Sequence, residues 1–466
     1  MSTPASTLHL AGRVHGLDVL RGLAIFGILI VNLEQMFIPL ALADKPVGVL
    51  PNESGAVIGW FLTDAFFRDK FLTVFSLLFG AGFCLQFLRS GDDRRGFRRL
   101  YLRRLAILVL FGIVHAVFFY MADVLVIYAL TAFLLFPWKR RRPRTLLGVG
   151  ALLLVAMTVW YVMPGSPDDP AESATIVAAL DIIRTTGKVP LVEAEYPMPE
   201  RVAIDAAVGL EPVGTDRVRV IGGEHALPLA APTAILILDG NDSVEQAKVE
   251  YAVFSEGPQK AAIFSRVTFL AFLLIVFSPL YLLWRTLGLF LIAAGLVKLG
   301  FLDVARKAAW SRVALIGFAL GLPATLYASW LRIEAYRNPG PTDWIGDAIH
   351  EVSSLLLAFA ISALIFIWCA GGLKGRFQRA LGAVGRTALT NYLGQSIVMS
   401  VVATAYGLGL YGDLTRLQLA ALAVGCFVGQ LILSVIWMKH FRIGPLEWVW
   451  RSLTYWRLMP LRRSAL

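Results

Sequence analysis

The chain has 466 residues, of which 57% are hydrophobic and 16% charged, and its formal net charge is +11. A soluble domain alternates apolar and polar faces, whereas this sequence repeats apolar runs close to the ~20 residues that cross a bilayer. The composition therefore excludes an ordinary soluble enzyme and predicts an all-α polytopic membrane protein. Because the arginines flank the apolar runs, membrane topology accounts for the positive charge, and no nucleic acid partner is expected.

Eleven apolar runs follow one another along the chain, and basic loops between them set the expected topology. The stretches RSGDDRRGFRRLYLRR and KRRRPR, two later basic loops and the arginine-rich tail are all expected to be cytoplasmic. Eleven crossings cannot satisfy all of these loops, whereas ten can. The sixth and seventh runs are joined only by the dipeptide WR, so one of them is expected to be re-entrant, interfacial or buried in the bundle. We therefore expect a bundle of about 10 (10–11) transmembrane helices with both termini cytoplasmic. The runs cover residues 18–40, 70–88, 101–120, 122–137, 145–163, 263–283, 285–300, 309–331, 347–371, 384–405 and 416–438.

Four parts are expected from this pattern: an N-terminal transmembrane half, an acidic insert, a C-terminal transmembrane half and a cytoplasmic amphipathic tail. The insert holds 16 of the 32 acidic residues but 7 of the 43 basic ones, and its place in the topology predicts an extracytoplasmic location. A helix is expected from Pro170 to Gly187, with strands in RVRVIGG and TAILILDGND, which together predict a small α+β insert. The four parts cover residues 1–164, 165–262, 263–440 and 441–466.

The first apolar run carries polar residues that a lipid-facing helix would avoid. Asp18 and Arg21 are three residues apart and therefore neighbours on one helix face. Asn32 follows Arg21 by eleven residues, which at ~100° per residue returns to nearly the same face roughly 16 Å further along. This stripe must face protein or water. It is either a structural ion pair with an interhelical hydrogen bond, or the wall of a functional path.

Between the first two runs, GAVIGWFLTDAFFRDKF is too polar to cross and predicts an interfacial or re-entrant helix at the mouth of a cavity. The patterns GFALG (317–321) and GCFVG (425–429) predict close helix packing. The three cysteines lie in apolar runs without ligand spacing, so no disulfide and no metal site are expected.

The stretch GIVHAVFFYMADVLVIY places His115 in the outer half of one run and Asp123 at the start of the next. A carboxylate beside an imidazole orients the ring and raises its pKa, as a general base requires. A structural hydrogen bond that closes the hairpin is the equally simple alternative.

Two further polar groups lie near the C-terminus. The stretch GRTALTNYLGQS again predicts a cavity, because it has a polar helix face. This face is formed by Asn391, Gln395 and Ser396, and Arg386 and Thr390 precede it. The amphipathic stretch GPLEWVWRSLTY has Glu447 and Arg451 four residues apart, and its tryptophans favour an interfacial helix. The sequence has no P-loop, dinucleotide fingerprint or GxSxG motif, so a transporter, a channel and a transferase all remain possible.

Five segments together resemble the YeiB-like bacterial inner-membrane proteins: LDVLRGLAIFGILIVN, KFLTVFSLLFGAGF, RRLAILVLFGIVHAVFFYMADVLVIYAL, LGAVGRTALTNYLGQS and GPLEWVWRSLTY. The similarity fades within 165–250. That family looks like a distant relative of the transmembrane acyltransferases, which include heparan-glucosaminide acetyltransferase and sugar O-acyltransferases. The resemblance implies a bacterial cytoplasmic membrane location, acyl-CoA as co-substrate and an envelope glycan or lipid as acceptor.

The resemblance also implies residue roles. The relatives' first shared helix reads Asp-x-x-Arg-Gly and then Asn, as here. An arginine at the cytoplasmic mouth suits CoA phosphates, and a deep amide suits the thioester oxyanion. The resemblance carries over Asp18, Arg21, Gly22 and Asn32, and the ALTNYL stretch carries over Asn391. The acyltransferase hypothesis adds residues taken from the sequence itself. It expects cofactor binding by Asp18, Arg21, Gly22, Arg103 and Arg104, catalysis by His115, Asp123 and Asn32, and substrate binding by Glu34, Asp64, Asn391 and Gln395.

The sequence departs from the relatives at one point: they place a catalytic histidine after the first shared helix, and residues 33–70 contain none. Glu34 or Asp64 would take its place, or His115 would approach from a neighbouring helix. Three hypotheses stand: a membrane acyltransferase, a transporter of a small metabolite or lipid, and a non-catalytic sensor or scaffold that acts through the insert.

Overall fold

The computed structural model describes residues 14–90, 94–162, 170–186, 195–197, 210–213, 217–220, 243–255, 257, 259–340 and 343–462. Within these ranges eight helical stretches are long and apolar enough to cross a membrane, and Ala388–Ala403 is a shorter apolar helix. The chain is therefore a nearly all-helical, multi-pass membrane protein, as its composition predicts. The eight stretches are His15–Phe37, Ala56–Arg89, Gly96–Phe118, Pro143–Tyr161, Gln259–Lys298, Val304–Arg337, Trp344–Cys369 and Arg416–His440.

The N-terminal half of the bundle consists of long helices joined by short connections, and proline starts one of them, as its fixed φ allows. The elements are α1 (His15–Phe37), α2 (Leu40–Ala43), α3 (Ala56–Phe66), α4 (Lys70–Arg89), α5 (Arg94–Phe118), α6 (Val124–Leu135), a 3₁₀ turn (Phe136–Arg140) and α7 (Pro143–Tyr161).

The C-terminal half starts after the insert. Its elements are α11 (Gln259–Phe272), a π-helical segment (Leu273–Leu282), α12 (Leu283–Lys298), a 3₁₀ turn (Val304–Arg306), α13 (Lys307–Arg337), α14 (Trp344–Cys369), α15 (Arg376–Arg386), α16 (Ala388–Ala403), α17 (Arg416–His440) and α18 (Pro445–Tyr455).

The apolar runs 263–283 and 285–300 form one continuous helical stretch rather than two. The WR dipeptide between them does not break the helix, because the Arg285 guanidinium pairs with the Glu351 carboxylate at 2.7 Å inside the bundle. The π-helical segment contains Pro279, whose missing N–H such a local widening accommodates. The structure therefore counts these two runs as one candidate span, Gln259–Lys298.

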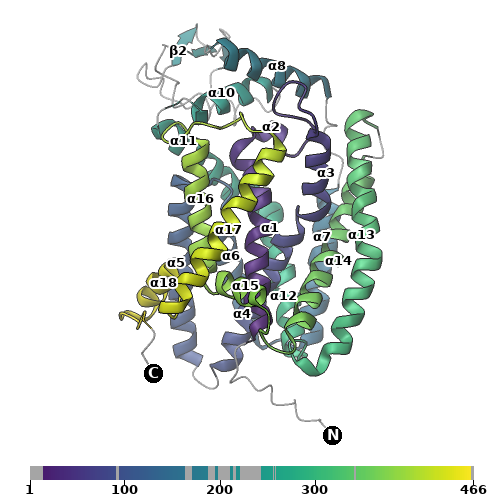
Figure 1. The fold of residues 1–466 in the computed structure, drawn as a ribbon, viewed down its shortest axis with the longest axis vertical. Coiled ribbons are helices and arrows are strands. Elements are labelled where there is room, and N and C mark those ends of the chain that lie inside the picture. The colour runs from purple at the N-terminus through teal and green to yellow at the C-terminus, as the bar shows by residue number, and fades with distance from the viewer. Residues whose placement is uncertain are drawn as a thin grey trace.

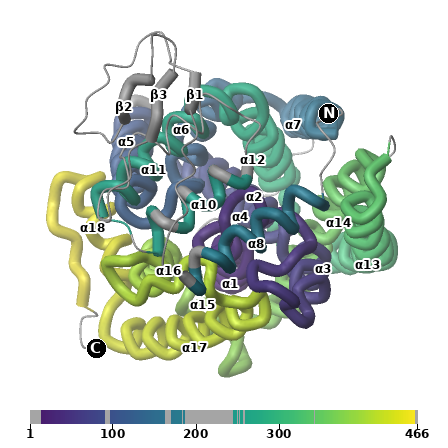
Figure 2. The backbone as a smooth tube through the Cα atoms, turned by 90° about the horizontal axis from the view of Figure 1, so that it is seen from above, coloured from purple at the N-terminus to yellow at the C-terminus, as the bar shows by residue number. Residues whose placement is uncertain are grey.

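Helix α1 runs through the middle of the bundle, as the view from above in Figure 2 shows. It packs against α4, α14, α15, α16 and α17. The α13–α14 hairpin lies on one side of it, and α5 and α18 lie on the other. The bundle thus has two ends: the terminal end, which carries the start of α1 and α18, and the insert end, which carries α8 and α10 (Figure 1).

Helices α1 and α15 approach so closely that only glycine fits at their crossing. A Cβ on Gly22 would lie 2.2 Å from the Leu381 carbonyl oxygen, and one on Gly385 would lie 1.8 Å from the Asp18 carbonyl oxygen. A Cβ added to Gly425 on α17 would meet no neighbouring element within 4 Å among the described residues. We expect Gly385→Ala to lower the free energy of unfolding by about 1–3 kcal/mol through overpacking. Thermal unfolding in detergent measures the effect, with Gly425→Ala as the matched control. An unchanged melting temperature for Gly385→Ala would contradict this packing.

The two small-residue patterns have different outcomes. At GFALG a Cβ on Gly317 would lie 2.7 Å from the Ala360 Cβ, so this pattern packs α13 against α14 as predicted. The prediction for GCFVG is wrong: in the part of the chain that the structure describes, no neighbouring element places an atom within 4 Å of a Cβ added to Gly425 or Gly429. The apolar side chains of Val424 and Val428 beside them are exposed, so this face of α17 does not pack inside the bundle.

The insert end carries the described parts of residues 165–262. Helix α8 (Pro170–Thr186) has the predicted start and stop, and α10 (Ser243–Ser255) packs against it and against α2. Strands β1 (Glu195–Pro197), β2 (Leu210–Val213) and β3 (Arg217–Val220) form an antiparallel sheet in the order β1-β3-β2. RVRVIGG supplies β3. The strand expected in TAILILDGND (233–242) lies outside the described residues.

A buried carboxyl group fastens α10 to the bundle. The Glu250 side chain accepts hydrogen bonds from the Tyr411 hydroxyl at 2.7 Å and from the Leu40 N–H at 3.1 Å. Burial raises the pKa of Glu250 from 4.5 to about 7. The folded protein therefore holds this proton more tightly than the unfolded chain does.

This raised pKa makes stability depend on pH. Because the folded-state pKa is above the unfolded value, the stabilisation is fully present below about pH 4.5 and is lost as the pH rises to about 7. We expect the melting temperature of the wild type to fall across this window, and Glu250→Gln to remove that dependence. A wild-type curve that rises with pH in the same window, or a Glu250→Gln curve with the same slope, would contradict the assignment.

Candidate functional site

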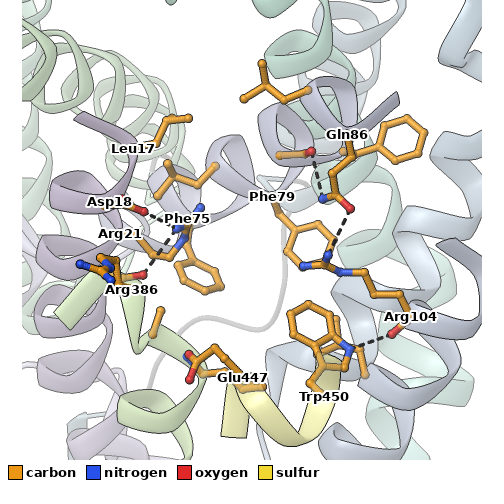
Figure 3. Close-up of a pocket in the computed structure, with 18 of the residues that line it drawn as sticks. Leu17, Asp18, Arg21, Phe75, Phe79, Gln86, Arg104, Arg386, Glu447 and Trp450 are labelled. Carbon is orange, nitrogen blue, oxygen red and sulfur yellow. Dashed lines mark hydrogen bonds and ion pairs between the residues drawn. The ribbon is translucent and has the colours of Figure 1, made fainter. Parts of the chain in front are cut away.

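A cavity of about 400 Å³ opens between helices α1, α4, α5, α6, α15, α16 and α18 at the terminal end. We call it the arginine cavity. Aromatic and aliphatic side chains form most of its wall, and charged groups gather on two sides of it. Figure 3 shows Asp18 and Arg21 on one side, Arg104 and Trp450 on the other, and Phe75 and Phe79 between them. This volume lies in the range of small-molecule sites.

The charge of this cavity is strongly positive. Its described lining residues include five arginines and two carboxylates, Asp18 and Glu447. Arg21 donates to the Asp18 carboxylate at 3.2 Å and to the Gly385 carbonyl at 3.4 Å. Arginine forks are the preferred partners of phosphate groups, so this mouth suits a multiply charged phosphate compound. The five arginines are Arg21, Arg89, Arg104, Arg386 and Arg451.

Helix α18 closes one side of the arginine cavity. The Trp450 indole donates to the Arg104 carbonyl at 3.0 Å, and the Arg104 guanidinium lies 4.0 Å from the Trp450 ring centroid. Glu447 accepts from the Leu389 N–H at 2.6 Å and from the Thr390 hydroxyl at 2.7 Å, which fastens α18 to the start of α16. Burial raises the pKa of Glu447. The stretch predicted as an interfacial anchor is therefore also a cavity wall.

Tyr392 links the arginine cavity to the His115–Asp123 pair. It lines the cavity, and its hydroxyl donates to the Asp123 carboxylate at 3.3 Å. His115 Nδ1 lies 2.8 Å from the same carboxylate oxygen. The other oxygen of Asp123 caps α6 by accepting from the Val126 N–H. Both partners have 0% exposed side chains, as expected for a pair held inside the bundle.

The geometry of this pair defines its chemistry. An Nδ1–H that donates to Asp123 leaves a lone pair on Nε2, and His115 Nε2 has no hydrogen-bond partner among the described residues. A buried polar nitrogen without a partner is costly in a structural role. This orphaned atom, oriented by a carboxylate, has the features of a general base.

Asn32 lies beyond this pair, toward the insert end. Its Oδ1 accepts from the Tyr120 hydroxyl at 3.1 Å, and the same hydroxyl contacts Gln35. The Tyr120 ring lies 6.1 Å from the His115 ring. Asn32 Nδ2 is buried without a partner among the described residues, so it remains a donor for an incoming oxygen.

Glu34 and Asp64 belong to a separate ion-pair cluster away from the arginine cavity. Glu34 pairs with Arg416 at 2.7 Å and with Arg68 at 2.9 Å. Asp64 pairs with Arg68 and Arg332 and accepts from the Ser329 hydroxyl at 2.7 Å. The hydrogen-bonding capacity of these carboxylates is filled by α13, by α17 and by Arg68 in the turn between α3 and α4, which is typical of structural pairs inside a membrane bundle.

The remaining predicted residues also take structural positions. Asn391 donates to the hydroxyl of Thr387, between α15 and α16, at 2.8 Å and to the Ser434 hydroxyl at 3.0 Å, which joins α16 to α17. Gln395 accepts from Gln430 at 3.3 Å on the same side. Neither residue lines the arginine cavity.

The residues implied as cofactor-binding divide into two groups. Asp18, Arg21 and Arg104 line the arginine cavity. Gly22 does not, because it lies in the contact between α1 and α15. Arg103 points to α18, where it donates to the Thr454 carbonyl at 3.1 Å.

Sequence reasoning missed several lining residues. Arg89 and Gln86 end α4 at the cavity, but the sequence presents that arginine only as one more charge beside a basic loop. Tyr392 follows Asn391, which the sequence analysis named, but the Tyr392 side chain contacts Asp123 whereas the Asn391 side chain contacts Ser434. A helical wheel of α16 separates the two residues by about 100° and would have placed them on different faces.

Comparisons with known proteins give relatives along nearly the whole chain. Residues 296–457 match the family model described as "Protein of unknown function (DUF418)". The chain is 26% identical to the "Uncharacterized protein YxaH" of Bacillus subtilis, with 97% of each chain covered. It is 28% identical to the "Uncharacterized protein YeiB" of Escherichia coli, with 94% of this chain and 95% of that protein covered. No solved structure matches the chain.

Proposed function

The chain belongs to the YeiB-like proteins, and from this premise we propose that it is a membrane-embedded acyltransferase of the bacterial cytoplasmic membrane. It moves an acyl group from cytosolic acyl-CoA to an envelope glycan or lipid. One observation carries the proposal. The cavity lined by five arginines is also lined by Tyr392, whose hydroxyl donates a hydrogen bond to Asp123 of the buried His115–Asp123 pair.

The proposed donor fits the order of groups along the cavity. The CoA phosphates bind the arginines at the terminal end, which is the cytoplasmic side in this proposal. The thioester end extends along the apolar wall formed by Phe75 and Phe79 toward Tyr392. The acceptor approaches from the insert end, past Asn32 and Tyr120. Orientation with both termini inside agrees with the basic loops near this end.

The proposed reaction is an attack of the acceptor hydroxyl or amine on the thioester carbonyl. His115 Nε2 takes the acceptor proton, a new C–O or C–N bond forms, and the C–S bond breaks. The proton then passes from His115 to the CoA thiolate, so the products are the acylated acceptor and CoA thiol. Asp123 holds the imidazolium, and the Asn32 amide donates to the oxyanion.

Release of CoA thiol from acetyl-CoA and longer acyl-CoAs tests this function. Purified protein is incubated with each thioester and a bacterial envelope extract, and free thiol and labelled acyl products are measured. We expect thiol release and acylated product in equal amounts with wild-type protein, and neither with Asp123→Asn. Absence of thiol release with all donors and extracts would overturn the proposal.

The ion-pair cluster of Glu34 and Asp64 favours a second candidate, a transporter. It includes the buried Lys70, whose ammonium lies 3.0 Å from His350 Nε2, and such intramembrane ionisable groups also serve proton-coupled transport. This alternative predicts flux of labelled ligand into proteoliposomes without thioester cleavage. The same preparation therefore distinguishes the two functions.

A further inference from the structure

A second cavity of about 400 Å³ lies beside the arginine cavity and is almost entirely apolar. We call it the apolar cavity. Its walls come from α1, α4, α12, α13 and α14. Ser362 is the one polar side chain among its described lining residues, and its hydroxyl donates to the Ala358 carbonyl of its own helix at 2.7 Å. Nothing along this wall favours a polar ligand.

The two cavities share a wall. Leu17 on α1 and Leu78 on α4 line both of them. The same two helices touch at Gly27, where an added Cβ would lie 2.0 Å from a Phe71 ring carbon. At Leu17 and Leu78 the arginine-rich cavity and the hydrocarbon-lined cavity lie next to each other.

A molecule that fills both spaces must carry phosphate groups at one end and a hydrocarbon chain at the other. We infer that the apolar cavity receives the acyl chain of the donor, so that the donor is a medium- or long-chain acyl-CoA. This inference rests on the proposed function and makes its substrate class specific. An acetyl group would leave the apolar cavity unused.

Affinity alone does not test the chain site, because a chain that leaves the bilayer for an apolar cavity gains little hydrophobic free energy. The position of the chain does test it. The probe is a CoA thioether with a twelve-carbon chain that ends in a photoreactive diazirine, bound to protein in nanodiscs. Cross-linked peptides are identified by mass spectrometry, and CoA affinity is measured by calorimetry on the same samples.

We expect cross-links to the segments 292–297 of α12 and 356–366 of α14, and loss of at least about nine-tenths of them with CoA at a hundred times its Kd. Leu296→Trp fills the apolar cavity and should reduce these cross-links about fivefold or more while CoA affinity stays within about twofold. Ala363→Phe tests the same space from α14. Leu315→Trp, on a surface-exposed position of α13, is the matched control and should change neither quantity.

The outcomes separate the two proposals. Cross-links that CoA does not displace would mean that ordinary bilayer lipid occupies the cavity, and would overturn the chain site. Displaceable cross-links elsewhere in the bundle would also overturn it and leave the proposed function standing. No binding of CoA by calorimetry would overturn the proposed function itself.

Discussion

Replacing His115 with glutamine is expected to reduce acyl transfer by at least about a hundredfold, because the proton acceptor is lost. Glutamine keeps a polar group beside Asp123 and so limits damage to the buried site. CoA affinity should remain within about threefold, since His115 does not line the arginine cavity. The measurement is kcat and KM for acyl-CoA, together with calorimetric CoA binding.

His440→Gln is the matched control for this variant. His440 is exposed at the end of α17, where its ring contacts only the Ile436 carbonyl among the hydrogen-bond partners described. It should retain wild-type kcat. Full activity of the His115 variant would assign the His115–Asp123 pair to closing the α5–α6 hairpin, which is the structural alternative.

Replacing Arg21 with alanine is expected to weaken CoA binding about 10- to 100-fold, as the loss of a charge-assisted hydrogen bond to phosphate predicts. Arg104→Ala should act in the same direction from the opposite wall. Arg103→Ala is the matched control, because this adjacent arginine faces the Trp456 ring of the tail rather than the cavity. Lysine in place of Arg21 should recover part of the affinity, since it keeps the charge without the fork.

The outcome that contradicts the arginine cavity is equally specific. If Arg21→Ala and Arg103→Ala weaken CoA binding by the same factor, the effect reflects the total positive charge of this end of the bundle. If neither changes it, CoA binds elsewhere. Thermal unfolding of each variant separates both outcomes from simple loss of fold.

Local spacing predicted the parts of the site that lie on one helix or one hairpin. Asp18 and Arg21 are three residues apart, and one turn of helix brings them together. His115 and Asp123 flank a short turn, and the chain has few other ways to place them. The apolar runs likewise predicted the helices, because a spanning segment must satisfy its backbone hydrogen bonds internally.

The sequence did not predict contacts between helices that are far apart in the chain. Glu34 pairs with Arg416 of α17 and Asp64 pairs with Arg332 of α13, and a single sequence does not state which helices meet. Trp450 lines the cavity because α18 packs on α5, and the sequence did not predict that packing either. Gly22 was assigned a binding role by resemblance, whereas its contact with α15 assigns it to packing. In a sequence, a glycine that makes room for a ligand cannot be told from a glycine that makes room for a neighbouring helix.

Calorimetric titration of the wild-type protein with CoA and with pantetheine tests the central claim most directly. Both ligands carry the thiol arm, but pantetheine lacks the phosphates that the five arginines would hold. The account predicts saturable CoA binding and at least about tenfold weaker pantetheine binding, since each charge-assisted contact contributes on the order of 1.5–3 kcal/mol. Equal affinity for the two ligands, or no binding of CoA, would contradict it.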